Sequence, residues 1–157
     1  MKYGKVALGG TFSKFHLGHL YFIERALNVA EEVIIGISSD VLVRWEGKKH
    51  PVEEYEERFA EVYRALVRLR AIDKAILVPL LDPYGPLLED PEIEALIVSK
   101  DSVKKGLKVN GERRKRGLRA IKLILVETVL AEDAKPISSR RIWKGEIDRL
   151  GRLASRA

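Results

Sequence analysis

The chain has 157 residues, of which 46% are hydrophobic and 33% are charged. This balance is typical of a globular domain with a buried core, so residues 1–157 are predicted to form a single domain. No apolar run approaches the roughly 20 residues that cross a bilayer, and the N-terminus lacks the apolar core of a signal peptide. We therefore expect a cytoplasmic protein that does not bind membranes. Abundant Lys, Arg and Glu, with no Gln and one Met, indicate adaptation to high temperature.

The net charge of +6 is unevenly distributed along the chain. Acidic residues concentrate between positions 53 and 61, and basic residues between positions 104 and 122. A basic stretch attracts polyanions, either nucleic acid or a small phosphorylated molecule. This stretch contains no aromatic residue on which bases could stack, so we expect no nucleic-acid partner.

Short apolar runs alternate along the chain with segments of helical periodicity. The first strand is predicted at residues 5–8 and is followed by a helix over 18–30. A second strand at 33–37 precedes a helix over 53–70, whose apolar residues recur every three to four positions. Further strands are predicted at 75–78, 95–98 and 121–126, and a last helix starts near 139 and runs toward the C-terminus.

This order predicts an α/β fold, a Rossmann-like doubly wound sheet of five parallel strands with helices on both faces. Ligands of such sheets bind beyond the carboxyl ends of the strands, where the strand order reverses. The segment after the first strand is therefore expected to lie in the binding site.

That segment, Gly9 to His19, reads GGTFSKFHLGH and joins the first strand to the first helix. A helix start offers unpaired N–H groups and the positive end of the helix dipole, which both favour an anion. Gly10 has no Cβ, so the backbone there can approach a phosphate closely. His16 and His19 are three residues apart, so both imidazoles can face one pocket. The segment is therefore predicted to hold a polyphosphate.

Two other kinds of site fit the sequence less well. The glycine-rich loops GxGxxG and GxxxxGK[ST] of dehydrogenases and P-loop proteins are absent. A structural zinc site usually needs four ligands, whereas the chain has three histidines and no cysteine, so no metal site is predicted. Near the C-terminus, Ser138 and Ser139 follow Pro136 and are suited to cap a second helix start.

The combination of Gly9-Gly10-Thr11-Phe12 with His16-Leu17-Gly18-His19 resembles the nucleotidyltransferase superfamily that carries the HxGH motif. Ile137-Ser138-Ser139, followed by Arg141, is similar to the second motif of that superfamily. Three stretches resemble the archaeal phosphopantetheine adenylyltransferase branch and the equivalent domain of eukaryotic coenzyme A synthase, namely residues 82–86, 97–118 and 135–142.

The resemblance implies a five-stranded nucleotidylyltransferase fold and transfer of AMP from ATP to 4′-phosphopantetheine, giving dephospho-coenzyme A and pyrophosphate. It implies direct attack by the acceptor phosphate, with Mg2+ carried on the triphosphate. The residues implied to bind ATP are Gly9, Gly10, Thr11, Phe12, His16, Gly18, His19, Ser138, Ser139 and Arg141. Those implied in catalysis are Thr11, His19, Lys48 and Lys49, and those implied to bind phosphopantetheine are Thr11, Lys48, Lys49, Asp82, Tyr84 and Arg113.

Several alternatives stay open at the level of the sequence. Lys48 and Lys49 are equally placed to bridge the acceptor and the α-phosphate, and Arg58 is a further candidate for the same pocket. FMN, nicotinamide mononucleotide and glycerol 3-phosphate are alternative acceptors. A non-catalytic nucleotide- or RNA-binding module is an alternative of another class. The sequence does not indicate the oligomeric state.

Overall fold

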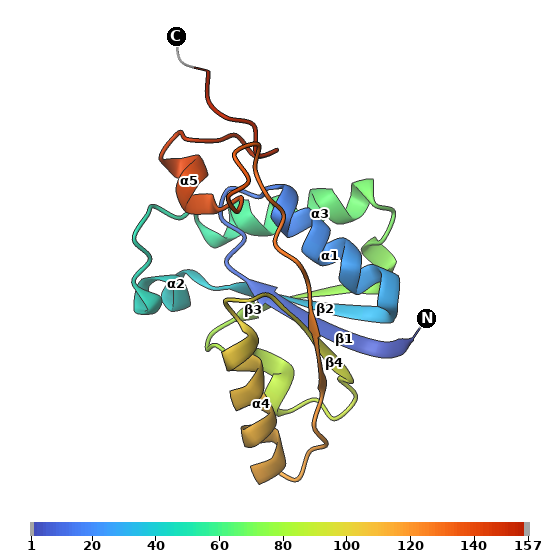
Figure 1. Cartoon of the computed structure of the whole chain (residues 1–157). Helices are drawn as coiled ribbons and strands as arrows, with labels where there is room; N and C mark the ends of the chain where they lie inside the picture. The colour runs from blue at the N-terminus through green and yellow to red at the C-terminus, as the bar shows by residue number, and fades with distance from the viewer. Residues whose placement is uncertain (1, 156–157) are drawn as a thin grey trace.

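The computed structural model describes residues 2–155 (Figure 1). The strands are β1 (Tyr3–Gly10), β2 (Ala30–Ser38), β3 (Ala75–Leu80), β4 (Ala95–Val98) and β5 (Lys122–Leu125). The helices are α1 (Leu17–Val29), α2 (Asp40–Glu46), α3 (Tyr55–Arg68), α4 (Val103–Lys115) and α5 (Ser139–Trp143), with two short 3-10 helices, η1 (Ile72–Lys74) and η2 (Gly85–Leu88). Every predicted strand is present, and the predicted helices at 18–30 and 53–70 correspond to α1 and α3.

The five strands form one parallel sheet in the order β3-β2-β1-β4-β5. β1 lies at its centre, where Val6 is the register partner of Val33 in β2 and of Ala95 in β4. Along the chain, β2 and β3 are added in turn on one side of β1. The chain then crosses back over the sheet, and β4 and β5 are added on the other side of β1. The strand order therefore reverses between β1 and β4, and the predicted doubly wound sheet is confirmed.

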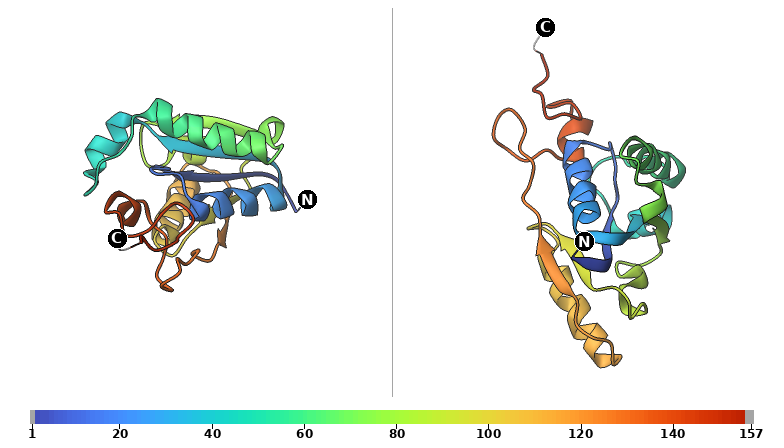
Figure 2. Two further views of the ribbon diagram at one scale, coloured as in Figure 1. Left: turned by 90° about the horizontal axis from the view of Figure 1, so that it is seen from above. Right: turned by 90° about the vertical axis from the view of Figure 1, so that its right-hand side faces the viewer.

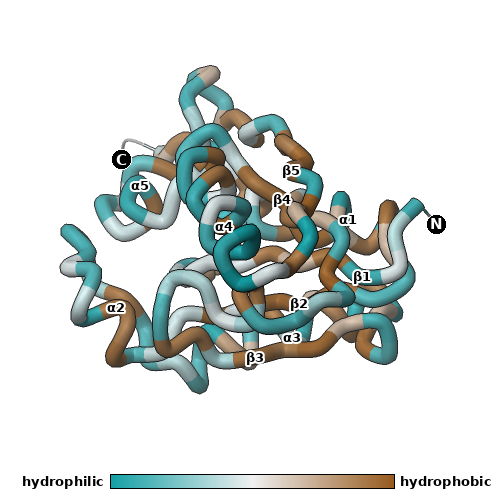
Figure 3. The backbone as a smooth tube through the Cα atoms, turned by 90° about the horizontal axis from the view of Figure 1, so that it is seen from below, coloured by the Kyte–Doolittle hydropathy of each residue, from teal (hydrophilic) through white to brown (hydrophobic). Residues whose placement is uncertain are grey.

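Alternate side chains of the strands point to opposite faces of the sheet and form two cores. On one face Val6, Ile35 and Ile97 belong to the core shared with α1 and α3. On the other face Ile34 and Leu96 belong to the core shared with η2 and α4. Figure 1 shows α1 and α3 above the sheet and α4 below it. In Figure 3 the strands are largely brown, whereas α4 is largely teal.

After β5 the chain runs to α5, which lies beside the start of α1 in both views of Figure 2. This C-terminal segment has a small core of its own, formed by Ala131, Ile137 and Ile147. The Leu17 N–H donates a hydrogen bond to the Arg149 carbonyl at 2.9 Å. The C-terminal segment is therefore fixed to the first turn of α1.

Three helices differ from the sequence-based expectation. The last helix is wrong in length, because α5 ends at Trp143 and Gly145, with a φ of 77°, turns the chain. α2 was not predicted because its seven residues are too few for a periodic pattern. α4 was not predicted because its sequence is mainly basic and buries only Gly106, Val109 and Arg113. No helix within residues 2–155 is long and apolar enough to cross a membrane.

Candidate active site

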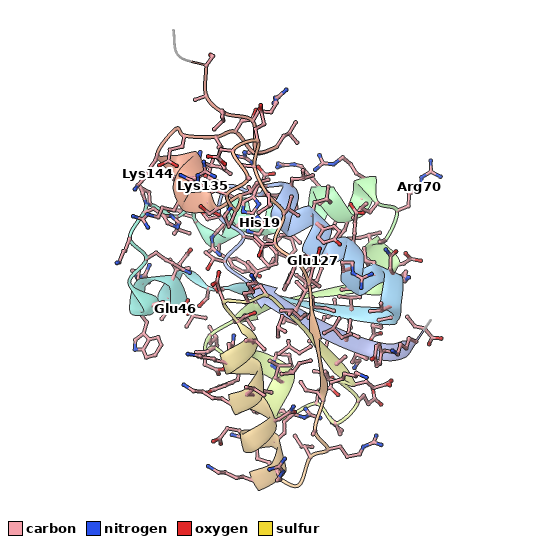
Figure 4. The ribbon with its side chains drawn as sticks, viewed as in Figure 1. His19, Glu46, Arg70, Glu127, Lys135 and Lys144 are labelled. Carbon is pink, nitrogen blue, oxygen red and sulfur yellow. The ribbon has the colours of Figure 1, made fainter. Side chains whose placement is uncertain are left out.

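A cavity of about 400 Å³ opens at the carboxyl ends of β1, β4 and β5, which is a volume typical of small-molecule sites. Its walls come from the β1–α1 loop, the loop after β4, the segment after β5 and the start of α5. Figure 4 labels two of the lining residues, His19 in the first turn of α1 and Glu127 in the segment after β5. The residues predicted to bind ATP that line this cavity are Gly9, Gly10, Phe12, His16, Gly18, His19, Ser138 and Ser139.

His16 and His19 cap the start of α1 with their imidazoles. Nδ1 of His16 accepts a hydrogen bond from the Gly18 N–H at 3.0 Å, and Nδ1 of His19 accepts one from the His16 N–H at 3.2 Å. The two rings stack with centroids 3.7 Å apart, and the His19 ring also lies 5.2 Å from Phe12 and 5.4 Å from Phe15. Because both Nδ1 atoms are acceptors, each neutral ring carries its proton on Nε2. The pair therefore offers two Nε2–H donors.

The surroundings hold both imidazoles neutral. Burial, and secondarily the positive charge of Arg149, lower the pKa of His16 to about 4. Burial, and secondarily the neighbouring His16, lower the pKa of His19 well below its usual value. At neutral pH both rings therefore donate hydrogen bonds without carrying a charge.

We expect the protein to lose stability as the pH falls from about 6.5 to about 4. Over this window the unfolded chain binds more protons at position 16 than the folded chain, so the free energy of unfolding rises with pH. The contribution of His16 amounts to about 3 kcal/mol between these limits. Guanidinium unfolding at about pH 7 and about pH 4 measures it.

The control is His16→Asn, whose amide oxygen can accept from the Gly18 N–H but does not titrate. The carboxylates are the same in both proteins and contribute equally to the pH dependence. The difference in unfolding free energy between the two pH values should therefore be smaller in this variant, which lacks only the contribution of His16. Equal pH dependence of the two proteins would contradict the buried, neutral His16.

Gly18 is required by the packing of the cap. A Cβ atom at this position would lie 2.9 Å from Cε1 of the His16 ring. The same Cβ would lie 3.0 Å from Nδ1, the atom that accepts the Gly18 N–H, so moving the ring away would weaken this hydrogen bond. The glycine of the HxGH motif is therefore explained here by room for the first histidine.

The loop between β1 and α1 is strained and held from two sides. Phe12 and Lys14 have φ values of 58° and 46°, which non-glycine residues rarely adopt. The Glu53 carboxylate accepts hydrogen bonds from the Ser13 hydroxyl at 2.6 Å and from the Lys14 N–H at 2.8 Å. Nε1 of Trp143 donates to the Ser13 hydroxyl at 3.0 Å, and the Lys14 ammonium lies 4.1 Å from the Trp143 ring centroid. Glu53 and Trp143 therefore fix the shape of the loop.

The two serines before α5 form the cap that the sequence predicts. Oγ of Ser138 accepts a hydrogen bond from the Arg141 N–H at 3.2 Å and caps the helix. Oγ of Ser139 donates to the Ser13 carbonyl, so α5 is tied to the β1–α1 loop. The two motifs, from opposite ends of the chain, thus meet at one wall of the cavity.

The Arg141 side chain does not have the position that the sequence predicted. Its guanidinium pairs with Asp133 and Glu146 and donates to the Pro136 carbonyl at 3.1 Å, so it holds the C-terminal segment together. Arg140, the residue before it, lines the cavity instead. The cation that faces the cavity from α5 is therefore Arg140.

Arg58 does not line the cavity but binds the backbone of segments next to it. It is fully buried, and its guanidinium donates to the carbonyls of Thr11 at 2.9 Å, Ser38 at 2.7 Å and Glu53 at 2.8 Å. It also pairs with Asp40 at 3.0 Å. These contacts join the ends of β1 and β2 to the loop before α3, so the expectation that Arg58 reaches the ligand is wrong.

The loop between α2 and α3 brings a different side chain to the cavity than predicted. Lys48 and Lys49 are both exposed, whereas their neighbour His50 lines the cavity. Nδ1 of His50 lies 2.7 Å from the Pro51 carbonyl, which can only accept, so Nδ1 donates this hydrogen bond. The site thus contains a third histidine, which the sequence did not single out because it has no motif around it.

The residues predicted to bind phosphopantetheine lie in three different places. The exposed Asp82 accepts hydrogen bonds from the Tyr84 and Gly85 N–H groups at 2.8 and 2.9 Å and forms the turn before η2. Tyr84 lines a second cavity on the α4 side of the sheet. Thr11 follows β1 and is partly buried, with its carbonyl on Arg58.

The prediction for Arg113 is wrong. Its side chain is fully buried near the end of α4 and donates to the carbonyls of Leu87 at 2.6 Å, Asp90 at 3.1 Å and Arg119 at 2.8 Å. α4 begins at the carboxyl end of β4 and runs back along the sheet, so Arg113 lies toward the opposite end from the cavity. It stabilises the packing of η2 on α4.

Several polar residues that line the cavity were not predicted as site residues. Ser99 and Asp101 follow β4, and Glu127 and Thr128 follow β5. Their position after the carboxyl ends of two strands is the signal that could have found them, because strand ends of a parallel sheet meet at one edge. Neither stretch carries a glycine pattern or a histidine pair.

Comparison with known proteins agrees with this geometry. The cytidylyltransferase-like family model matches residues 7–145. A phosphopantetheine adenylyltransferase of Methanopyrus kandleri is 42% identical over 147 residues, which cover 94% of this chain and 92% of that protein. A phosphopantetheine adenylyltransferase of Methanosarcina barkeri is 43% identical over 152 residues, which cover 95% of this chain and 92% of that protein.

Solved structures show the same fold. A protein of unknown function from Archaeoglobus fulgidus superimposes with a TM-score of 0.71 at 30% identity, covering 85% of this chain and 99% of that one. A pantothenate synthetase from Thermus thermophilus has a TM-score of 0.58 at 19% identity over 90% of this chain and 62% of that one, which reflects the fold alone. The chain belongs to the cytidylyltransferase-like family, and within it to the group of archaeal phosphopantetheine adenylyltransferases.

Proposed function

We propose that this chain transfers AMP from ATP to the 4′-phosphate of phosphopantetheine and releases dephospho-coenzyme A and pyrophosphate. The observation that carries this proposal is the identity of 42% and 43%, over nearly the whole chain, to archaeal enzymes named for this activity. The site supports it, because phosphate-binding segments from both ends of the chain line one cavity. Since ATP is a substrate, we infer that the enzyme acts in the cytoplasm.

The triphosphate of ATP is assigned to the wall formed by α1 and residues 138–140. The Nε2–H groups of His16 and His19 are free to donate to phosphate oxygens, and the start of the 13-residue α1 adds a positive dipole end. His19 is assigned to the α-phosphate, where charge develops during transfer, and His16 to the outer phosphates. Arg140 adds a positive charge for the departing pyrophosphate.

The reaction proceeds in this proposal by direct, in-line attack. An oxygen of the acceptor phosphate forms a bond to the α-phosphorus of ATP, and the bond to the pyrophosphate oxygen breaks. The acceptor is already an anion, so no general base is required. The hydroxyls of Ser138 and Ser139 are engaged in hydrogen bonds with the backbone, and the chain has no cysteine. Catalysis then rests on positioning and on stabilising charge.

The donor set of the cavity fits Mg2+ that arrives with ATP. Within residues 2–155, no group of three or more His, Cys, Asp or Glu side chains is placed to hold a metal ion. Mg2+ in nucleotide sites keeps several waters and uses one or two carboxylates besides the phosphates, and Asp101 and Glu127 line the cavity. When bound, Mg2+ would neutralise part of the negative charge of the triphosphate.

The test is pyrophosphate release from ATP and Mg2+ at elevated temperature with four acceptors offered separately. These are 4′-phosphopantetheine, FMN, nicotinamide mononucleotide and glycerol 3-phosphate. We expect release with phosphopantetheine alone. Release with another acceptor would support nucleotidyl transfer but contradict phosphopantetheine as the substrate. No release with any of the four would favour a module that binds nucleotides without catalysis.

A further inference from the structure

A second cavity lies on the opposite face of the sheet from α1. It is lined by the ends of β1, β2 and β4 together with Leu80, Tyr84 and Lys105. Its volume of about 40 Å³ is a few times what one water needs, which suits a small group such as a phosphate. Figure 3 views the molecule from this side, with α4 in front of the strands.

The two cavities adjoin at one strand end. Gly9 and Ser102 line both of them. Gly9 lies near the end of β1, and Ser102 immediately precedes α4, so both lie where the strand order reverses. A group in the second cavity would therefore lie next to a nucleotide phosphate held by the β1–α1 loop. Such an arrangement brings a second substrate to the α-phosphate from the other side of the sheet.

Lys105 is the cation of this second cavity. It is the third residue of α4 and is partly buried, and the start of the 13-residue helix adds a positive dipole end beside it. Burial lowers the pKa of Lys105, while the negative charges of Glu46 and Asp82 act through space in the opposite direction. Within residues 2–155, Lys105 makes neither a hydrogen bond nor an ion pair. A half-buried ammonium that no neighbouring side chain pairs with is suited to bind an anion that enters the cavity.

We propose that the Lys105 ammonium binds the phosphate of the acceptor substrate from the α4 side of the sheet. This inference rests on the proposed function, because it concerns the acceptor of that reaction. The phosphate is the anionic group of phosphopantetheine, and the cavity that holds Lys105 adjoins the one assigned to ATP. Leu80 and Tyr84 line the same cavity and offer carbon surface to the part of the acceptor next to the phosphate.

The test compares Lys105→Met with the wild-type enzyme in steady-state pyrophosphate release. Methionine keeps the length of the stem and removes the charge. We expect the KM for phosphopantetheine to rise at least about tenfold, since a charge-assisted hydrogen bond is lost, while the KM for ATP stays within about twofold. Lys105→Arg should retain most of the acceptor affinity. The matched control is Lys104→Met at the adjacent, exposed lysine, which should change neither constant.

Thermal unfolding should show that Lys105→Met is about as stable as the wild type, because the half-buried ammonium makes no hydrogen bond or ion pair within residues 2–155. If it does not fold, Lys105→Gln, which keeps a donor but loses the charge, gives the same comparison. An unchanged KM for phosphopantetheine, or an equal rise in both KM values, would overturn the assignment.

The design separates the two proposals. If the wild type uses phosphopantetheine and its KM is unaffected in Lys105→Met, the inference fails and the proposed function stands. If the wild type uses another phosphorylated acceptor, the proposed function fails, and the same selective rise in the KM for that acceptor supports Lys105. If no acceptor is used, both fail.

Discussion

His19→Ala is expected to lower kcat by at least about 100-fold while leaving the fold intact. The reason is geometric: Nδ1 of His19 accepts the His16 N–H, so only its Nε2–H is left to donate to the α-phosphate, to which the proposed function assigns it. In the proposed assignment, this neutral donor would stabilise the charge that develops on the α-phosphate more than it stabilises bound ATP. The loss should therefore appear in kcat rather than in the KM for ATP. Steady-state pyrophosphate release measures both constants.

The matched variant is His19→Asn, because its amide oxygen can replace Nδ1 as the acceptor while no group replaces Nε2–H. We expect it to be nearly as inactive as His19→Ala but more stable, since the cap of α1 is kept. Circular dichroism and thermal unfolding establish the fold of both variants. Near-normal turnover of His19→Asn would show that His19 acts only through the cap.

The sequence predicts the sheet well because its signal is local. Buried parallel strands are continuous apolar runs, such as Val33 to Ile37, and their order with helices leaves few topologies. The position of the site follows from the same logic, because the Gly9–His19 segment sits after the first strand. α2 and α4 were missed because one is short and the other buries only Gly106, Val109 and Arg113, so neither has a clear apolar stripe.

The roles of the arginines could not be predicted in the same way. Arg58 and Arg113 look like ligand-binding cations in the sequence, yet both are fully buried and donate mainly to backbone carbonyls. Several of these carbonyls are distant in sequence, such as that of Ser38, 20 positions from Arg58, and that of Leu87, 26 positions from Arg113, and a carbonyl is the same in every residue type. The sequence therefore carries no local sign of them. The prediction chose Arg141 where the structure has Arg140 at the cavity for a related reason. Consecutive residues at the start of a helix point in different directions, and the sequence does not show which of the two faces the cavity.

Arg58→Met is expected to lower the free energy of unfolding by about 3–5 kcal/mol. The substitution leaves the Thr11, Ser38 and Glu53 carbonyls without their donor and Asp40 without its cation. Water cannot replace the guanidinium easily, because the side chain has no exposed surface. Equilibrium unfolding in guanidinium measures the loss. Arg64→Met on the exposed side of α3 is the control and should change stability by less than about 0.5 kcal/mol.

The same substitution separates positioning from binding. Arg58 binds the carbonyls of Thr11 and Glu53, and the Glu53 carboxylate in turn binds the Ser13 hydroxyl and the N–H of the strained Lys14. Loss of Arg58 should therefore lower kcat even at temperatures where the variant is fully folded. Arg58→Lys, which keeps the charge but not the planar fork, should recover little of either property, because one ammonium cannot reach carbonyls on three segments. Full activity of folded Arg58→Met would show that the loop keeps its shape without the brace, and that Glu53 and Trp143 alone suffice.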